Sequence, residues 1–371
     1  MIRVGIIGTR GIPNHYGGFE QFAELLSVYL VKNSHEVFVY NSSTHPYQGK
    51  TFKNVRIIHC SDPEKKIGTI GQFLYDLNCI LDSRKRNFDI ILQLGYTSSS
   101  IWSFLFPKKP ILITNMDGLE WKRAKYALPI KTFLKYAEKL AVKHSDFLIS
   151  DSLGIQNYLE EKYNATSKYI PYGAKNIEEP SKLVLNKYHL LEYTYNLLIA
   201  RLEPENNIES ILDGVVLSKD KTLFLVIGCY ANKFGHRLKE KFKNHEHILF
   251  LGSIYNSEEL NSLRYFSNLY FHGHSVGGTN PSLLEAMGCN ALIIAHDNIF
   301  NKAVLEEDGY YFSNMIDIKN YLLEKNKLFE KEKLNTNRIK INQQYNINNI
   351  NSSYLSFFYE CLEANKDKIN V

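Results

Sequence analysis

The segment from His272 to Gly288 contains the residues whose types and spacing point most clearly to chemistry. It passes from an apolar run through a glycine pair into a helical pattern that begins with Thr-Asn-Pro. Backbone N–H groups at the start of a helix carry partial positive charge and bind phosphate well. We therefore expect a diphosphate to bind here, at the backbone N–H groups of Gly278, Thr279 and Asn280.

One acid and two histidines belong to the same segment. Glu285 lies about one turn into the predicted helix, where its carboxylate can accept hydrogen bonds from ribose hydroxyls. His272 and His274 have the spacing of a pair of metal ligands, but the sequence offers no third ligand beside them. A ligand contact or a packing role is therefore favoured over zinc.

Arg201 directly follows another apolar run, which ends at Ala200. An arginine at the end of a strand can bind phosphate with two parallel hydrogen bonds, and the alternative is an ordinary surface arginine. Asn206 lies in the same polar segment. Because no Asp-x-Asp occurs in the chain, a carboxylate-held magnesium is not expected, and the predicted site needs no metal or other cofactor.

The loop after the first apolar run contains several glycines between residues 8 and 20 and ends in Gly17-Gly18. A nicotinamide-dinucleotide site is the first alternative to consider here. Its Gly-x-Gly-x-x-Gly fingerprint is absent, and the next apolar run ends in Tyr40-Asn41 rather than in an acid for the ribose. A dehydrogenase is therefore disfavoured, and the long loop suggests a roomy ligand cleft.

Asp117 and Glu120 follow the apolar run at residues 111–114. Ligands of open α/β sheets bind beyond the carboxyl ends of the strands, so these carboxylates can reach a cleft. Asp117 can then orient a hydroxyl or act on it as a base. The alternative is that Asp117 caps the helix that follows.

Short apolar runs alternate with helical patterns throughout the chain, which predicts parallel strands joined by helices. The alternation stops near residue 175 and restarts near residue 195, so we expect two α/β domains. The predicted division is 1–175, 176–345 and a final helix at 346–371 that returns to the first domain. The length of 371 residues accommodates two such cores.

Composition excludes several classes of protein. With 44% hydrophobic and 22% charged residues the chain is expected to be globular rather than disordered. No apolar run is long enough to span a membrane, and the first residues do not have the pattern of a secretion signal. Five cysteines without a Cys-x-x-Cys pair argue against a disulfide scaffold and indicate a reducing cytoplasm.

A net charge of +5 is too mild for a dedicated nucleic-acid binder. The basic excess falls in the first half, and much of it lies between residues 121 and 143. This stretch is either an ordinary helix with a solvated basic face or a surface that attracts anionic lipid head groups.

Together, six ordered motifs resemble the GT-B fold glycosyltransferases of family 4, and within them the bacterial rhamnosyltransferase subgroup. The resemblance runs over most of the chain, about residues 1–310, and the motifs lie at residues 8–13, 16–20, 117–123, 170–174, 200–207 and 272–287. The resemblance implies an α/β fold of two Rossmann-like domains whose parallel sheets face a central cleft. It also implies transfer of a sugar from a nucleotide donor to a lipid-linked saccharide, with retention of the anomeric configuration.

The residue patterns and the resemblance together predict roles for individual residues. Asp117 and Arg201 would be catalytic. The donor would be held by Gly17, Gly18, Arg201, Asn206, Gly277, Gly278, Thr279, Asn280 and Glu285. The acceptor would be held in the first domain by Tyr16, Glu20, Asp117 and Glu120.

Two departures from the wider family agree with the rhamnosyltransferase subgroup. Gly277 stands where the wider family has the first of two glutamates, and Asn206 stands where it often has a lysine. The resulting hypothesis is a cytoplasmic enzyme, peripheral on the inner face of the cell membrane, that uses dTDP-rhamnose in the synthesis of a bacterial polysaccharide such as capsule or lipopolysaccharide. Alternatives are another donor such as a UDP-sugar, a nucleotide-sugar 2-epimerase on the same fold, and a non-catalytic binder of sugar nucleotides.

Overall fold

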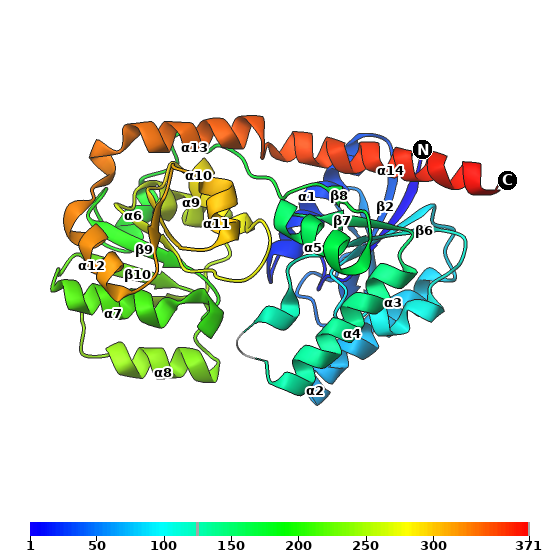
Figure 1. Ribbon diagram of the computed structural model, residues 1–371, viewed down its shortest axis with the longest axis horizontal. Coiled ribbons are helices and arrows are strands. Elements are labelled where there is room, and N and C mark those ends of the chain that lie inside the picture. Colours follow the sequence, from blue (N-terminus) through cyan, green and yellow to red (C-terminus); the bar gives the residue numbers. More distant parts are fainter. Residues whose placement is uncertain (124–125, 370–371) are drawn as a thin grey trace. The chain divides into compact units, whose positions relative to one another are not determined.

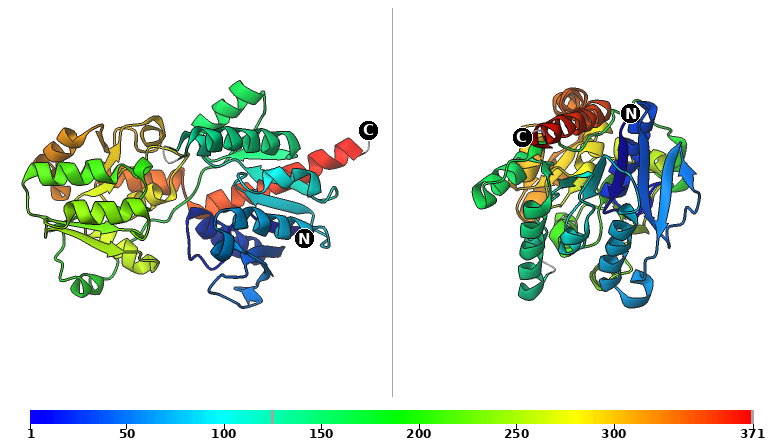
Figure 2. Two further views of the ribbon diagram at one scale, coloured as in Figure 1. Left: turned by 90° about the horizontal axis from the view of Figure 1, so that it is seen from below. Right: turned by 90° about the vertical axis from the view of Figure 1, so that its right-hand side faces the viewer.

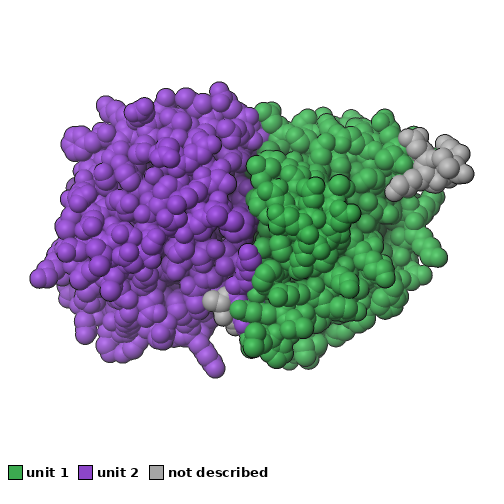
Figure 3. Space-filling view, in the orientation of Figure 1, with its two compact units in different colours: residues 1–121, 127–172, 348–371 green, residues 122–126, 173–347 purple. Residues whose placement is uncertain are grey.

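The computed structural model describes residues 1–123 and 126–369 and divides into two compact units, coloured separately in Figure 3. Unit 1 comprises Met1–Trp121, Ala127–Tyr172 and Asn348–Val371, and unit 2 comprises Lys122–Tyr126 and Gly173–Ile347. The sequence predicts a domain boundary at residue 175, and in the structure the chain passes from unit 1 to unit 2 after Tyr172. The short segment Lys122–Tyr126, which the sequence analysis assigned to the first domain, belongs to unit 2.

Unit 1 is built on a sheet of eight strands in the order β3-β4-β2-β1-β5-β6-β7-β8. Neighbouring strands are parallel except β3 and β4, which are antiparallel. The strands are β1 (Arg3–Ile7), β2 (Glu36–Ser42), β3 (Thr51–Phe52), β4 (Val55–Cys60), β5 (Ile90–Leu94), β6 (Ile111–Asn115), β7 (Phe147–Ser150) and β8 (Lys168–Tyr169).

The helices of unit 1 connect these strands (Figure 1). They are α1 (Gly18–Lys32), α2 (Glu64–Ile67), α3 (Ile70–Ser83), α4 (Leu128–His144) and α5 (Leu153–Tyr163), with short 3-10 turns η1 (Ser100–Leu105) and η2 (Glu120–Lys122). The helix α1 shows why they pack: Phe22, Ala23, Leu26 and Leu30 recur at helical spacing, and all four are buried. The apolar pattern of the sequence predicts this face.

The last helix, α14 (Ile347–Ile369), packs against unit 1, as its red ribbon in Figures 1 and 2 shows. The ring of Tyr354 lies 4.8 Å from that of Phe22, and its hydroxyl accepts a hydrogen bond from Asn115 at 2.9 Å. Phe357 packs edge-on against Phe147 at 6.1 Å. The helix therefore closes one side of the sheet with apolar contacts that its aromatic residues supply.

Unit 2 is built on an all-parallel sheet of six strands in the order β11-β10-β9-β12-β13-β14. The strands are β9 (Tyr195–Ile199), β10 (Leu223–Ile227), β11 (Ile248–Gly252), β12 (Tyr270–His272), β13 (Ile293–His296) and β14 (Tyr310–Phe312). The three central strands are buried, which explains their continuous apolar runs.

The helices of unit 2 bury a core of Leu, Ile and Phe side chains against this sheet. They are α6 (Leu183–Lys187), α7 (Ile208–Ser218), α8 (Lys233–Phe242), α9 (Ser257–Tyr265), α10 (Pro281–Gly288), α11 (Ile299–Leu305), α12 (Met315–Glu324) and α13 (Lys331–Gln343), with 3-10 turns η3 (Pro204–Asn206) and η4 (Lys327–Phe329). The α/β class with two parallel-sheet units is confirmed. Three short edge strands, β3, β8 and β14, are not among the predicted strands.

Candidate functional site

Two of the predicted donor segments meet in unit 2. The side chain of Ser275 donates a hydrogen bond to the backbone oxygen of Glu205 at 2.7 Å, and the Asn207 amide donates to the backbone oxygen of Gly273 at 2.8 Å. Both segments follow neighbouring strands, β9 and β12. Residues about 70 positions apart in the sequence therefore form one surface beyond the carboxyl ends of these strands.

Arg201 is exposed on this surface, and Asn206 supports it. The amide of the buried Asn206 donates to the backbone oxygen of Arg201 at 2.7 Å. This contact fixes the backbone from which the guanidinium extends. The role that the structure gives the Asn206 side chain is thus to position Arg201.

His272 and His274 stack in parallel, with ring centroids 4.4 Å apart. Burial, followed by the charges of Arg201 and Arg123, lowers the pKa of His274 to about 3, so this ring is neutral at pH 7. His272 is 1% exposed, and within the described part of the chain its ring nitrogens have no hydrogen-bond partner. The two rings therefore pack against each other, and the charge of Arg201 acts on the neutral imidazole of His274.

The predicted phosphate loop leads into α10. Asn280 is the N-cap: its side chain accepts a hydrogen bond from the backbone N–H of Ser282 at 2.9 Å. Gly277 has φ +133°, a conformation that residues with a Cβ rarely adopt. A glutamate at this position would therefore strain the loop, which gives a physical reason for the glycine. Thr279 is buried, whereas Gly278 is half-buried.

Glu285 forms an ion pair with a residue that the sequence analysis did not identify. The guanidinium of Arg264, on α9, lies 2.5 Å from the Glu285 carboxylate, and the two side chains are 3% and 23% exposed. Arg264 also donates to the hydroxyl of Ser282 at 3.3 Å. The carboxylate predicted to bind ribose is thus held in place by a buried cation.

Arg123 is a second cation that the sequence analysis missed. It pairs with Glu205 at 3.3 Å, with side-chain exposures of 16% and 2%. Its charge also acts on His274, as does that of Arg201. The motif at residues 117–123 contained this arginine, but spacing alone does not reveal that Lys122–Tyr126 packs with unit 2.

The predicted acceptor residues lie in unit 1. Asp117 follows β6 with φ +48°, which is uncommon for a residue other than glycine and is often found at functional sites. The helix α4 begins at Leu128 and its N-cap is Ala127, so Asp117 does not cap that helix. The alternative of a capping role there is wrong.

Carboxylates gather around a buried tyrosine at this edge of the sheet. Burial raises the pKa of Tyr172 well above its ordinary value, and the charges of Asp117, Asp151 and Glu20 raise it further. These acids come from three different elements. The charges of Asp117 and Glu20, both predicted for the acceptor, thus act on the same buried hydroxyl.

The glycine-rich loop at residues 8–20 is fixed by its own polar contacts. Glu20 is 4% exposed and accepts a hydrogen bond from the Arg10 backbone N–H at 2.7 Å, so its carboxylate holds the loop. Gly17 is the N-cap of α1, which begins at Gly18. Tyr16 is 57% exposed, and the Arg10 guanidinium lies 5.3 Å from its ring centroid.

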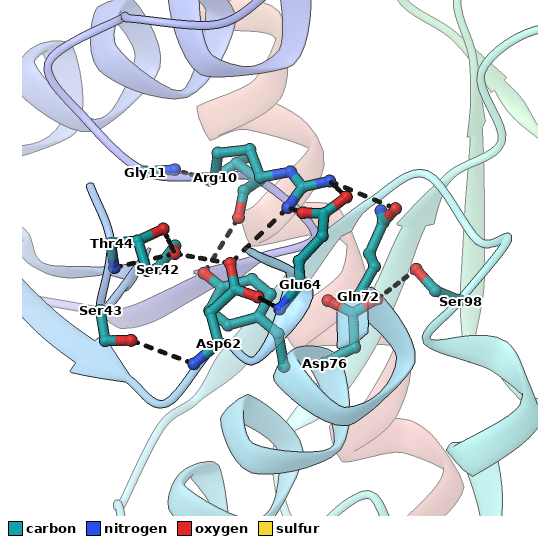
Figure 4. Close-up of polar contacts among 12 residues, drawn as sticks. Arg10, Gly11, Ser42, Ser43, Thr44, Asp62, Glu64, Gln72, Asp76 and Ser98 are labelled. Atoms are coloured by element: carbon teal, nitrogen blue, oxygen red, sulfur yellow. Dashed lines mark hydrogen bonds and ion pairs between the residues drawn. The ribbon is translucent and has the colours of Figure 1, made fainter. Parts of the chain in front are cut away.

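Arg10 is the centre of an acidic cluster, shown in Figure 4. Its guanidinium contacts Glu64 with both terminal nitrogens, and Asp62 lies 3.6 Å away. Nearby, Ser98 donates to Asp76, whose burial raises its pKa to about 6. No pattern in the sequence indicates this cluster, because its members come from four separate segments.

The basic stretch at residues 121–143 forms the exposed side of α4, although residues 124–125 lie outside the described residues. Lys135, Lys139 and Lys143 are exposed, together with Leu128 at 79%. Tyr136 is 57% exposed, because the buried residues of α4 are Leu134, Ala137, Glu138 and Ala141. No described helix has both the length and the apolar character that crossing a membrane requires.

The two halves of the chain match two different protein families. Residues 1–175 match a domain of unknown function, DUF1972, and residues 188–345 match the glycosyl transferases group 1. An uncharacterized glycosyltransferase of Methanocaldococcus jannaschii is 26% identical over 231 residues, which are 57% of this chain and 58% of the relative. The chain thus spans little more than half the length of this relative.

Solved structures show the same fold over the whole chain. Sucrose-phosphate synthase of Thermosynechococcus elongatus superposes with a TM-score of 0.80 at 15% identity, covering 98% of this chain and 100% of its own. HepE of Anabaena, in complex with UDP-glucose, gives 0.74 at 14% identity, with coverage of 98% and 100%. These findings support a GT-B glycosyltransferase. They do not distinguish the rhamnosyltransferase subgroup.

Proposed function

We propose that this chain transfers L-rhamnose from dTDP-rhamnose to a lipid-linked saccharide during synthesis of a bacterial cell-surface polysaccharide. The observation that carries the proposal is the surface of unit 2 on which Arg201, the loop from Gly277 and the start of α10 follow neighbouring strands. It lies within the residues that match group 1 glycosyl transferases. The UDP-glucose complex of HepE supports a nucleotide sugar as donor, and the motif resemblance supports rhamnose.

Each residue then has a defined task. Arg201 and the backbone N–H groups of 278–280 stabilise the charge that grows on the departing diphosphate. Glu285, aligned by Arg264, accepts a hydrogen bond from the ribose. Asp117 orients or deprotonates the acceptor hydroxyl, with Glu120 beside it in the sequence. Retention of the anomeric configuration and independence of metal ions and other cofactors complete the proposal.

We place the enzyme at the inner face of the cell membrane, in the cytoplasm, on the basis of α4. Its exposed lysines attract anionic head groups, at about 1 kcal/mol for each basic residue near the surface, and Leu128 offers an apolar contact. Binding to vesicles with and without phosphatidylglycerol measures this attraction. Changing Lys131, Lys139 and Lys143 to Gln should abolish the preference for anionic vesicles, whereas equal binding of both proteins would contradict it.

A donor screen tests the function itself. We expect dTDP-rhamnose to raise the melting temperature more than UDP-sugars do, and to support transfer to synthetic lipid-linked mono- and disaccharides, with or without EDTA. Greater stabilisation and transfer with a UDP-sugar would establish the alternative donor. Conversion of donor without any acceptor would establish a 2-epimerase. Donor binding without turnover on the natural acceptor would indicate a non-catalytic binder.

A further inference from the structure

One buried carboxylate in unit 1 collects an unusual number of hydrogen-bond donors. Glu138, on α4, is 1% exposed. Five side chains donate to it: Tyr96 at 3.2 Å, Trp121 at 3.1 Å, Tyr158 at 2.7 Å, Lys162 at 3.0 Å and Tyr163 at 2.6 Å. They come from α5 and from the two segments that follow β5 and β6.

The donors satisfy a charge that would otherwise be costly to bury. An unpaired carboxylate in the interior destabilises a fold by several kcal/mol or so, whereas one with a cation and several N–H or O–H donors is tolerated. Lys162 supplies the cation, and its ammonium also lies 5.5 Å from the ring centroid of Trp121. Any movement of the rings would leave part of the Glu138 charge unpaired. Rearranging the network therefore costs hydrogen bonds to a charged group, which opposes such movement.

Trp121 connects this network to the predicted acceptor residues. It ends the segment that begins with Asp117 and contains Glu120. Its indole N–H donates to Glu138 at 3.1 Å, and Lys135 lies over its ring at 4.4 Å. The side chain of Trp121 is thus held by the Glu138 carboxylate and by the ammonium groups of Lys135 and Lys162.

Tyr96 makes a second connection. Its hydroxyl donates to Glu138, and the ring is 2% exposed. Besides burial, the charges of Glu138, Glu120 and Asp117, in that order, raise the pKa of Tyr96. The hydroxyl of Tyr96 therefore contacts the carboxylate on α4, and the charges of both predicted acceptor carboxylates act on it.

We infer that Glu138 is a positioning residue for acceptor binding: through Trp121 and Tyr96 it fixes the segment 117–121 so that Asp117 and Glu120 meet a saccharide hydroxyl. This inference rests on the proposed function. Glu138 itself contacts no substrate. Its loss should impair the use of acceptor while leaving the donor site in unit 2 intact.

The experiment uses Trp121 as a reporter. The chain has two tryptophans, so Trp102→Phe leaves Trp121 as the single emitter. In this background we compare Glu138→Gln, which keeps the shape and removes the charge, with Glu160→Gln on the exposed side of α5 as the matched control. Emission, acrylamide quenching, and KM and kcat for acceptor and donor are measured.

We expect Glu138→Gln to shift the emission of Trp121 to the red and to increase its quenching. The acceptor kcat/KM should fall by at least about tenfold, because small displacements of reacting groups reduce rates strongly. The donor KM should change less than about twofold, since Glu138 belongs to unit 1 and the predicted diphosphate and ribose contacts belong to unit 2. The Glu160→Gln control should match the parent protein in all measurements.

Two results would overturn the inference. One is unchanged emission and acceptor kinetics in Glu138→Gln, and the other is an equal loss of donor and acceptor use. If the parent protein transfers no sugar, the proposed function fails. The emission of Trp121 needs no turnover and then still decides whether Glu138 fixes the segment.

Discussion

The carboxylate of Glu285 and the guanidinium of Arg264 lie 2.5 Å apart, and the arginine is almost fully buried. A buried cation of this kind depends on its partner, because the interior solvates charge poorly. Burial lowers the pKa of Arg264, and the charge of Glu285 is the largest of the influences that outweigh burial and raise this pKa. The residue predicted to bind the ribose therefore also stabilises unit 2.

Removing Glu285 should thus affect stability and binding together. Glu285→Ala leaves Arg264 without its anion and should lower the free energy of unfolding by about 3 kcal/mol. The double variant Arg264→Met with Glu285→Gln removes both charges and should regain most of this stability without regaining nucleotide affinity. Urea unfolding and calorimetric titration with dTDP measure the two effects. Full recovery of nucleotide affinity in the double variant would show that Glu285 does not contribute to donor binding.

Arg201→Ala should weaken binding of the diphosphate. Hydrogen bonds to charged groups contribute about 1.5–3 kcal/mol each, which corresponds to a rise in Kd of roughly tenfold to a hundredfold. Arg201→Lys should recover only part of the lost affinity, because an ammonium cannot form the two parallel hydrogen bonds that a guanidinium makes with phosphate. The exposed Arg237, which pairs with Glu209 on the same unit, provides the matched control. Equal effects of Arg201→Ala and Arg237→Ala would exclude a specific role.

Asp117→Asn tests the acceptor side. A group that takes a proton in the transition state contributes about 10²–10⁴-fold to the rate, so kcat should fall by this factor while the donor Kd changes little. Asp89→Asn is the control, because Asp89 precedes β5 at the opposite end of the sheet. Steady-state kinetics with donor titration measure both quantities. A parallel loss of donor affinity in Asp117→Asn would place Asp117 outside the acceptor site.

The sequence predicts the strands and the chemistry of the loops better than it predicts the partners of charged residues. The run Ile111–Thr114 corresponds to β6 because buried parallel strands are apolar throughout. The two-residue strands β3 and β8 are too short for any period to identify. The register of the two sheets follows from tertiary pairing, which a local pattern does not contain.

The missed charged residues have a common physical reason. Arg264 and Glu138 are buried and Arg123 is half-buried, each beside partners distant in sequence, whereas their types normally indicate a solvated surface. One signal was available for Glu138: it occupies the buried stripe of α4 between Leu134 and Ala141 at helical spacing. A buried acid on an apolar stripe needs hydrogen-bond donors, and the sequence does not show which residues provide them in the folded chain.

The raised pKa of Asp76 predicts that the stability of the fold depends on pH. Burial raises its pKa to about 6 in the folded chain, from an ordinary value of 3.8. The folded state therefore binds the proton more tightly than the unfolded state, so stability from this group is full below about pH 4 and is lost as pH rises to about 6. Asp76→Asn should raise the free energy of unfolding at pH 7.5 by about 2 kcal/mol and have no effect at pH 4.

Denaturant unfolding at both pH values checks this prediction. Ser98→Ala provides a second arm, because the hydrogen bond from Ser98 lowers the pKa of Asp76 and its removal should move the transition to higher pH. An Asp76→Asn protein that is less stable than the parent at pH 7.5 would show that the carboxylate is stabilised in its charged form.

Gly11 and Gly68 form a matched pair for the glycine-rich loop. Both have positive φ, +120° and +67°. A Cβ at Gly11 would lie 2.3 Å from the Asn41 side chain, whereas a Cβ at Gly68 would meet no atom within 4 Å. Asn41 cannot move away readily, because its amide exchanges hydrogen bonds with the backbone of Ile12 at 3.0 and 2.8 Å. An alanine therefore meets backbone strain at both positions and a clash only at Gly11.

Gly68→Ala should cost about 1–3 kcal/mol, the backbone strain alone of a conformation that is almost restricted to glycine. Gly11→Ala should cost about 2–6 kcal/mol, since overpacking adds about 1–3 kcal/mol to such strain. Urea unfolding of the two variants measures the difference. The double variant Gly11→Ala with Asn41→Ala removes the clash and should approach the cost of Gly68→Ala after correction for Asn41→Ala alone. An equal cost for Gly11→Ala and Gly68→Ala would mean that the loop can move away from Asn41, and that its conformation is not fixed by this contact.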